Sequence, residues 1–325
     1  MKPMVSWSEH EADICASIRA NPSELKILLK TKDDAFFLRE WIEHHRKIVG
    51  IENLIVFDNN STDSSVIDVY AAYSDQLLVV SFEGFHNYVH DVSHFPGLYN
   101  ALAASCRFYT FLDTDEFLGF FDGENFLDGE AVREHLPESR GAFIPAVWLY
   151  NYPGYRDRFI LGDDASTFRN GVAWGKPIIS AAAPVRWNIN HNCQIAGSQG
   201  VEADPMPGYF LFHYAQLSPK QRIRANLNKL VARGYLAAGS TIDDVIGLDT
   251  SGQSDNIKLY VSEISYLATL PELEGALDAP LTQGTFRLSS ERRPVFFSPR
   301  EKGLFQSVLE NFSEICEDVL GGQAR

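Results

Sequence analysis

The chain has 325 residues, of which 45% are hydrophobic and 22% are charged, the composition of an ordinary globular protein. Its formal net charge of −15 would repel a nucleic-acid backbone, and no cluster of Lys and Arg offsets that repulsion locally. Four scattered cysteines form no CxxC pair, which argues against a zinc site or a disulfide framework. The composition therefore excludes nucleic-acid-binding proteins and disulfide-stapled folds.

The N-terminal region carries Glu9, Glu11 and Asp13 where a signal peptide would need an apolar run. No stretch reaches the roughly 20 apolar residues of a membrane-spanning helix. We therefore expect a cytoplasmic protein without a transmembrane segment, in which the isolated thiols stay reduced.

Short apolar runs alternate with longer amphipathic stretches from residue 25 onward. The continuous apolar runs predict buried strands at residues 25–29, 54–57, 77–80, 108–112 and 142–150. Helical spacing predicts helices at residues 37–49, from a cap at Ser61 or Thr62 to Tyr73, 96–105, 221–233 and 303–320. The alternation favours an α/β fold, in which helices flank a mainly parallel sheet on both faces.

Three polar clusters follow predicted strands directly: Asp33/Asp34, Asp58–Asp63 and Asp113–Glu116. Ligands of open α/β sheets bind at the carboxyl ends of the strands, so we expect the clusters to converge at one edge. Residues 151–208 are rich in Gly, Pro, Asn and aromatic residues, and they predict loops on the acceptor side of such a site.

Asp113 and Asp115 are two residues apart, so on extended backbone both carboxylates leave the same face. Paired carboxylate oxygens suit a hard cation such as Mg²⁺ or Mn²⁺. Such a cation could bridge a diphosphate and neutralise the charge on a departing nucleoside diphosphate. A DxD motif alone is weak evidence, and its place at the end of an apolar strand strengthens it.

Several segments together resemble glycosyltransferase family 2 and, more closely, its relative family 92. They are Lys32–Asp34, Leu38–His45, Ile55–Asp63, Phe111–Phe117, Lys176–Ile178, His191, His213–Tyr214, and Ser218 with the basic helix that follows it. The resemblance covers roughly residues 26–234. It implies a GT-A-type, Rossmann-like fold and a nucleotide-sugar donor, with a UDP-sugar favoured. It also implies Mn²⁺ or Mg²⁺ as cofactor and inversion at the anomeric carbon.

The resemblance also implies roles for individual residues. Asp58 and Asn59 occupy the position that contacts the base or ribose, and Asp33 lies near the nucleotide. Asp115 would ligate the metal, and Asp113 would contact the metal or the ribose. The chain departs from the family 2 pattern at Asn59 and Asn60, where Asp-Gly is common, and this leaves the base open.

His213 matches the late histidine that many GT-A enzymes place on the metal. The alternative is a strand-end histidine that bonds to backbone. Lys176 and Arg169 are candidate phosphate partners, with ordinary surface cations as the alternative. His44 and His45 are adjacent on a predicted helix and point about 100° apart, so we expect structural roles.

An inverting transfer needs a general base for the acceptor hydroxyl. We favour Asp164, because it shortly precedes residues 169–176, which could face the diphosphate. Each carboxylate could equally be a solvated loop residue. The full set of candidates is Asp157, Asp163, Asp164, Glu202 and Asp204.

We expect a catalytic nucleotide-sugar-binding domain over residues 1–235 and a mainly helical C-terminal extension over 236–325. The expected partners are the donor and a glycan or lipid-linked acceptor. Two alternatives stay open: a phosphatase of the haloacid dehalogenase type, whose DxD also ends a strand, and a non-catalytic nucleotide-sugar-binding protein.

Overall fold

The computed structural model describes most of the chain. The described residues are 4–136, 143–161, 172–183, 185–189, 192–195, 208–237, 239–269 and 284–310. Within them, no helix combines the length and the apolar character that crossing a bilayer requires.

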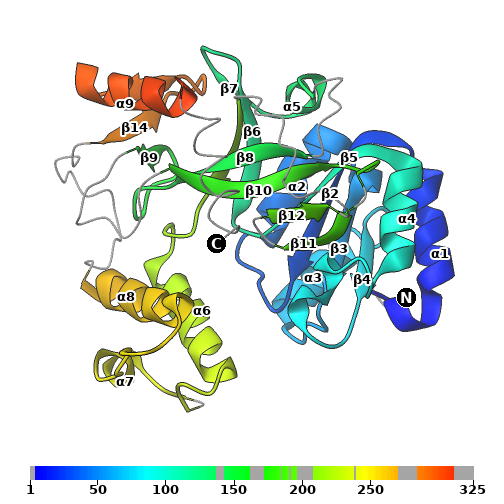
Figure 1. The fold of residues 1–325 in the computed structure, drawn as a ribbon, viewed down its shortest axis with the longest axis horizontal. Helices are drawn as coiled ribbons and strands as arrows, with labels where there is room; N and C mark the ends of the chain where they lie inside the picture. The colour runs from blue at the N-terminus through cyan, green and yellow to red at the C-terminus, as the bar shows by residue number, and fades with distance from the viewer. Residues whose placement is uncertain are drawn as a thin grey trace.

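A ten-stranded sheet runs through the molecule in the order β1-β4-β3-β2-β5-β10-β8-β13-β6-β7 (Figure 1). Its strands are β1 (Val5–Ser6), β2 (Ser23–Thr31), β3 (Leu54–Asp58), β4 (Leu78–Ser81), β5 (Cys106–Leu112), β6 (Glu116–Phe121), β7 (Phe126–Leu127), β8 (Phe143–Tyr150), β10 (Val172–Ser180) and β13 (Tyr209–His213). Five of the nine described pairings are parallel, including every pairing from β1 to β5. The predicted α/β fold with a mainly parallel sheet is confirmed.

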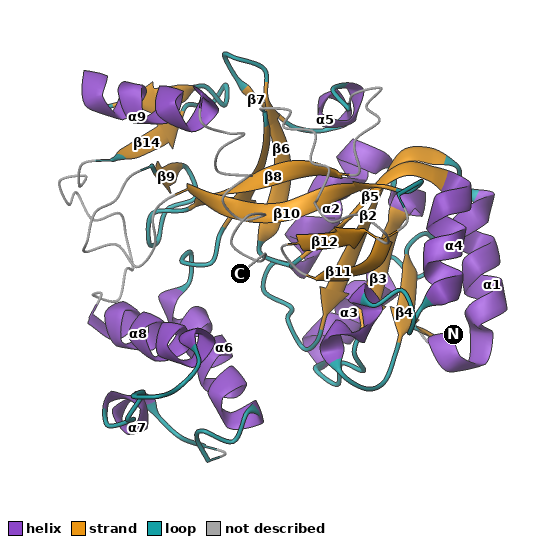
Figure 2. Cartoon of the chain, viewed as in Figure 1, coloured by secondary structure: helices purple, strands orange, loops and turns teal. Residues whose placement is uncertain are grey.

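Helices cover both faces of the parallel half (Figure 2). They are α1 (Trp7–Ala20), α2 (Leu38–Val49), α3 (Ser64–Ala72) and α4 (Pro96–Ser105), with short 3₁₀ turns η1 (Ile51–Asn53) and η2 (His86–His90). A further short helix, α5 (Glu130–Glu134), packs on α2 and β6. The helices α1 and α4 pack together, whereas α2 contacts α3 and α5. The apolar side of α2 is buried at Leu38, Trp41, Ile42, Ile48 and Val49. This is the one-faced spacing that the sequence predicted.

The first turn of α3 corrects one prediction. Asp63, rather than Ser61 or Thr62, caps the helix, because its carboxylate accepts the Ser65 backbone N–H at 2.9 Å. The Ser61 hydroxyl is used elsewhere, since it donates to Asp58 and accepts the Asp33 backbone N–H.

Residues 151–208, which were expected to be loops, contain four strands in their described part. These are β9 (Arg158–Ile160), β10, β11 (Val185–Ile189) and β12 (Asn192–Ile195). Glycine and proline within β10 hid this strand from pattern analysis. Gly175 is needed there, because a Cβ would come within 2.5 Å of the Ala146 carbonyl oxygen on β8.

The C-terminal helices α6 (Pro219–Ala232), α7 (Ile242–Ile246) and α8 (Asp255–Thr269) share a small core of their own. Its buried residues are Ile223, Leu230, Val245, Ile257, Ile264 and Leu267. The expected boundary at residue 235 falls between α6 and the two helices that pack with it.

The last described elements join the main core instead. The strands β14 (Thr285–Leu288) and β15 (Pro294–Phe296) form a three-stranded sheet with β9. Helix α9 (Pro299–Glu310) places Phe305 5.1 Å from the Phe121 ring centroid. This helix begins before the predicted start at residue 303, and residues 311–320 of the prediction lie outside the described residues.

Candidate functional site

The strand order reverses between β2 and β5, because β3 and β4 lie on one side of β2 and β5 lies on the other. In open α/β sheets, ligands bind outside the carboxyl ends of the strands at such a point. The loops that leave β2, β3 and β5 here carry the three predicted acidic clusters.

Hydrogen bonds tie the loop after β2 to the loop after β3. Asp33 Oδ1 accepts the backbone N–H groups of Thr62 at 2.6 Å and Asp63 at 2.8 Å. The Asp33 backbone N–H donates to Ser61 Oγ at 2.7 Å. Asp33 has φ +48°, a left-handed conformation that Asp tolerates better than most residues. Asp33 is exposed and holds the two loops together.

Asp58 is fully buried and shapes the turn that follows it. Its Oδ1 accepts the Ser61 backbone N–H at 2.5 Å, and its Oδ2 accepts the hydroxyls of Ser61 and Tyr70, both at 2.7 Å. Both oxygens are therefore used within the protein. Asn59 follows, with its side-chain amide donating to the Phe82 carbonyl at 3.2 Å.

Asp34 links the loop after β2 to the loop after β5, because its Oδ2 accepts a hydrogen bond from the Thr114 hydroxyl. Burial raises the pKa of Asp34, although this hydrogen bond opposes the effect. Together with the contacts of Asp33, this bond confirms that the three clusters converge at one edge of the sheet.

Asp113 is paired with a buried lysine. Its Oδ2 lies 2.7 Å from Lys176 Nζ, and Lys176 is also 3.8 Å from Glu116. Glu116 is fully buried and accepts the Asp113 backbone N–H at 2.8 Å and the Trp148 indole N–H at 2.6 Å. Burial alone would lower the pKa of Lys176, but the two carboxylates raise it. Lys176 therefore stays charged, although its side chain is only 3% exposed. The sequence predicts phosphate as its partner, whereas its partners in the structure are Asp113 and Glu116.

Asp115 faces a different pair of groups. His213, at the end of β13, places Nε2 3.2 Å from Asp115 Oδ2, and Arg222 of α6 lies 3.9 Å from the same oxygen. Burial would raise the pKa of Asp115, but His213 and Arg222 lower it to about 2. Asp115 is therefore ionised at neutral pH. The His213 ring packs against Trp148 and Tyr150, with both centroid distances 4.8 Å.

The predicted metal ligands are only partly brought together. Asp115 and His213 are adjacent, whereas the Asp113 carboxylate is turned to Lys176. In the described part of the chain, no three His, Cys, Asp or Glu side chains are grouped so that they could hold a metal ion. The residues as placed do not fit the three-ligand site that the sequence predicted.

His44 and His45 are structural, as predicted. His44 Nε2 is 2.7 Å from the Leu118 carbonyl, and His45 bonds to the backbone of Trp41 and of Leu118. Both rings thus fasten α2 to β6.

The predicted general base, Asp164, lies outside the described residues. Three other candidate bases, Asp163, Glu202 and Asp204, also lie outside them. So do Arg169, the candidate phosphate partner, and His191, which belongs to the family pattern. Asp157 is described and is exposed beside β9.

The sequence pattern singles out neither Trp148 nor Arg222, whose partners Glu116 and Glu263 are distant in sequence. One clue was present in β2, where two lysines interrupt an apolar run. Lys26 Nζ donates to Asn53 Oδ1 and Lys30 Nζ to Asn87 Oδ1, both at 2.7 Å. A lysine inside a buried strand predicts a buried polar partner, because an unpaired buried charge is costly.

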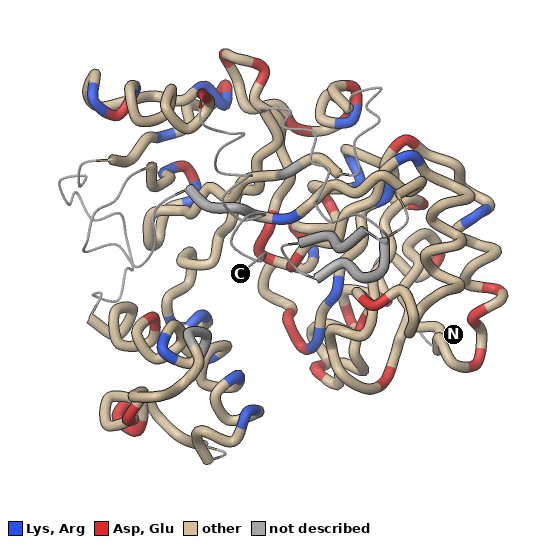
Figure 3. Tube along the Cα trace, in the orientation of Figure 1, with Lys and Arg blue, Asp and Glu red and all other residues tan. Residues whose placement is uncertain are grey.

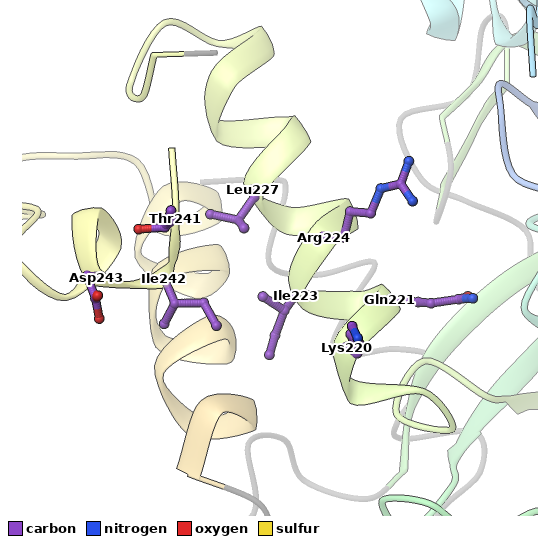
Figure 4. A pocket seen from close by; sticks show the side chains of 8 residues that line it. All are labelled: Lys220, Gln221, Ile223, Arg224, Leu227, Thr241, Ile242 and Asp243. Carbon is purple, nitrogen blue, oxygen red and sulfur yellow. The ribbon is translucent and has the colours of Figure 1, made fainter. Parts of the chain in front are cut away.

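A separate groove of about 650 Å³ lies between α6 and α7 (Figure 4). It is lined by Lys220, Gln221, Ile223, Arg224, Leu227, Thr241, Ile242 and Asp243. None of the strand-end residues described above lines it.

No protein-family model and no curated protein sequence matches the chain. Among solved structures, a 1–349 fragment of S. aureus TarS is 11% identical, covers 74% of this chain and 70% of its own length, and has a TM-score of 0.26. A longer TarS structure is 14% identical over 72% of this chain and 44% of its own, with a TM-score of 0.29. The mannosyltransferase PcManGT from Pyrobaculum calidifontis, in complex with GDP-Man and Mn²⁺, is 12% identical over 77% and 71%, with a TM-score of 0.27. Likeness at this level does not place the chain in a family.

Proposed function

We propose that the chain is a glycosyltransferase that uses a nucleotide diphosphate sugar as donor and a hydroxyl group as acceptor. One observation carries the proposal. The loops after β2, β3 and β5 are bonded into one acidic edge at the point where the strand order reverses, and the ionised Asp115 faces His213 and Arg222 there. A UDP-sugar is the donor we expect from the sequence resemblance.

The proposed transfer forms a bond from the acceptor oxygen to the anomeric carbon. The bond from that carbon to the β-phosphate oxygen breaks, and the nucleoside diphosphate leaves with the bonding electrons. A base must take the acceptor proton, and direct displacement would invert the anomeric centre. Asp164 stays our prediction for this base.

Metal dependence also stays a prediction. Asp115 and His213 would contribute two adjacent ligand atoms for Mn²⁺ or Mg²⁺. A bound ion would supply positive charge to the leaving diphosphate. Asp113 is not counted as a ligand in this proposal, because Lys176 is its partner.

Calorimetric titration of UDP, GDP, ADP and CDP, first with Mn²⁺ and then with EDTA, tests the proposal. The four nucleosides without phosphate serve as matched controls. Tighter binding of one diphosphate than of the others would support the donor site and identify the base. Loss of that binding in EDTA would support the metal. Absence of binding to all four would refute the proposal and favour the phosphatase alternative.

A further inference from the structure

Helix α6 follows the strand that carries His213 and contains several Lys and Arg residues (Figure 3). Arg222, Asn226 and Lys229 are spaced by four and then three residues, so they share one face of the helix. Arg222 lies at the start of this face, 3.9 Å from Asp115. The face therefore begins at the candidate site and continues along α8.

A buried carboxylate on α8 fixes Arg222. Glu263 is 1% exposed, and its Oε1 accepts the Arg222 Nε–H at 3.0 Å. Its Oε2 accepts the Asn226 side-chain amide at 2.7 Å. Because Asn226 holds the second oxygen of Glu263, the carboxylate is fixed and restricts the orientation of the Arg222 guanidinium. The N–H groups of Arg222 that do not bond to Glu263 remain for contacts at the site.

Lys229 differs from Arg222, because no carboxylate among the described residues pairs with it. Its ammonium group lies 5.2 Å from the Tyr260 ring centroid. Burial and then Arg222 lower the pKa of Lys229 to about 8, although Asp115 opposes this. Burial and then Lys30 lower the pKa of His86, and Lys229 is the smallest of the contributing charges.

Arg222 and Lys229 are cations on the same face of α6, and after burial the charge of Arg222 is the largest cause that lowers the pKa of Lys229. They repel each other, and a doubly charged anion between them would remove the repulsion. We infer that Arg222 and Lys229 bind the phosphate groups of the nucleotide donor, and that Glu263 is the residue that positions Arg222. The inference rests on the proposed function. It assigns the phosphate contact to α6 instead of Lys176.

Lys229→Met tests the phosphate contact, with Arg233→Met as the matched control. Arg233 is the residue that follows the end of α6, four positions after Lys229, and its guanidinium is also 5.2 Å from the Tyr260 ring. We expect Lys229→Met to weaken binding of the preferred nucleoside diphosphate about tenfold or more in calorimetry, as loss of a charged contact would. Binding of the matching nucleoside should be unchanged, and Arg233→Met should bind both like the wild type.

Glu263→Gln tests the positioning role. We expect weaker diphosphate binding with unchanged nucleoside binding, and an effect that is not additive with Arg222→Lys. A merely structural role would lower the melting temperature and leave the ratio of diphosphate to nucleoside affinity unchanged, which would overturn the positioning role. If the wild type binds a diphosphate and both Lys229→Met and Arg222→Lys bind it equally well, the phosphate contact is refuted. If the wild type binds no diphosphate, the proposed function itself fails.

Discussion

The acidic edge of the sheet and the helical unit α6–α8 meet at the candidate site, and they are built differently. The carboxylates of Asp33, Asp34 and Asp58 are already hydrogen-bonded within the loops that carry them, and the main core lies behind them. The unit α6–α8 has a much smaller core and carries Lys229, which no described carboxylate pairs. Most of these acidic residues hold the edge together, and we propose that the ligand contacts come from Asp115 and the basic helix α6.

Asp58→Ala should have the largest effect on stability. It leaves the Tyr70 hydroxyl and the Ser61 backbone N–H buried without their acceptor. We expect the free energy of unfolding to fall by about 3–4 kcal/mol in urea denaturation. The control Asp68→Ala, on the exposed side of α3, should change it by less than about 0.5 kcal/mol. A small effect of Asp58→Ala would mean that the acidic edge is not held together by this residue.

Asp115→Asn should have the largest effect on ligand binding. It removes the ionised group between His213 and Arg222 while keeping the side-chain shape. We expect diphosphate affinity in Mn²⁺ to fall by about a hundredfold, or about 2.7 kcal/mol, with little change in melting temperature. The exposed control Asp157→Asn should bind normally. If Asp115→Asn binds the diphosphate more tightly in EDTA than the wild type does, Asp115 only repels phosphate and is not a metal ligand.

The pH dependence of binding should follow Lys229. Burial and then Arg222 lower its pKa to about 8, against the charges of Glu263, Asp113 and Asp115. Below pH 8 the ammonium form is present and can hold phosphate, and above pH 8 the free protein loses this proton. We expect diphosphate affinity to fall about tenfold from pH 7 to pH 9, because Lys229 loses its charge over this range. The terminal phosphate of the nucleotide has a pKa of about 6, so its own charge hardly changes between these pH values.

The Lys229→Met variant provides the control for that measurement. Its diphosphate affinity should not change over the same pH range. If the affinity of Lys229→Met falls with pH as that of the wild type does, another group causes the pH dependence. The assignment of the phosphate contact to α6 rather than to the acidic edge would then lose support.

Ile264→Val should have the smallest effect and should separate the two cores. Ile264 is fully buried in the core of α6–α8. Removing one methylene should cost about 1 kcal/mol. Native-state hydrogen exchange should then accelerate about fivefold for amides of α8 and stay unchanged for amides of β2 and β5. Equal acceleration in both would mean that the chain unfolds as one unit.

Much of the parallel half could be predicted from the sequence. The strands β3 and β5 and the helix α2 match their predicted ranges within a few residues, because continuous apolar runs and a one-faced helical spacing leave few alternatives. β10 was missed, because Gly175 and Pro177 are typical of loops and their place in the strand depends on the neighbouring β8. That information lies in the partner strand and not in the local pattern.

The candidate site was predicted only in part for the same reason. The acidic residues could be located, because each directly follows an apolar strand. Their partners could not, since Lys176 reaches Asp113 from β10 and Glu263 reaches Arg222 from α8. Such pairs are set by sheet order and helix packing, and no spacing within one segment encodes them.

The pairing of β14 with β9 has a practical consequence for dividing the chain. Phe286 of β14 is fully buried, with its ring centroid 5.5 Å from that of Phe159 on β9. A fragment that ends at residue 235 would leave β9 with an open edge and would uncover Phe159 and Phe126, which also packs on Phe286. Open strand edges beside exposed aromatic rings favour self-association. Shortened versions of this chain should therefore keep the residues through α9 to remain monodisperse.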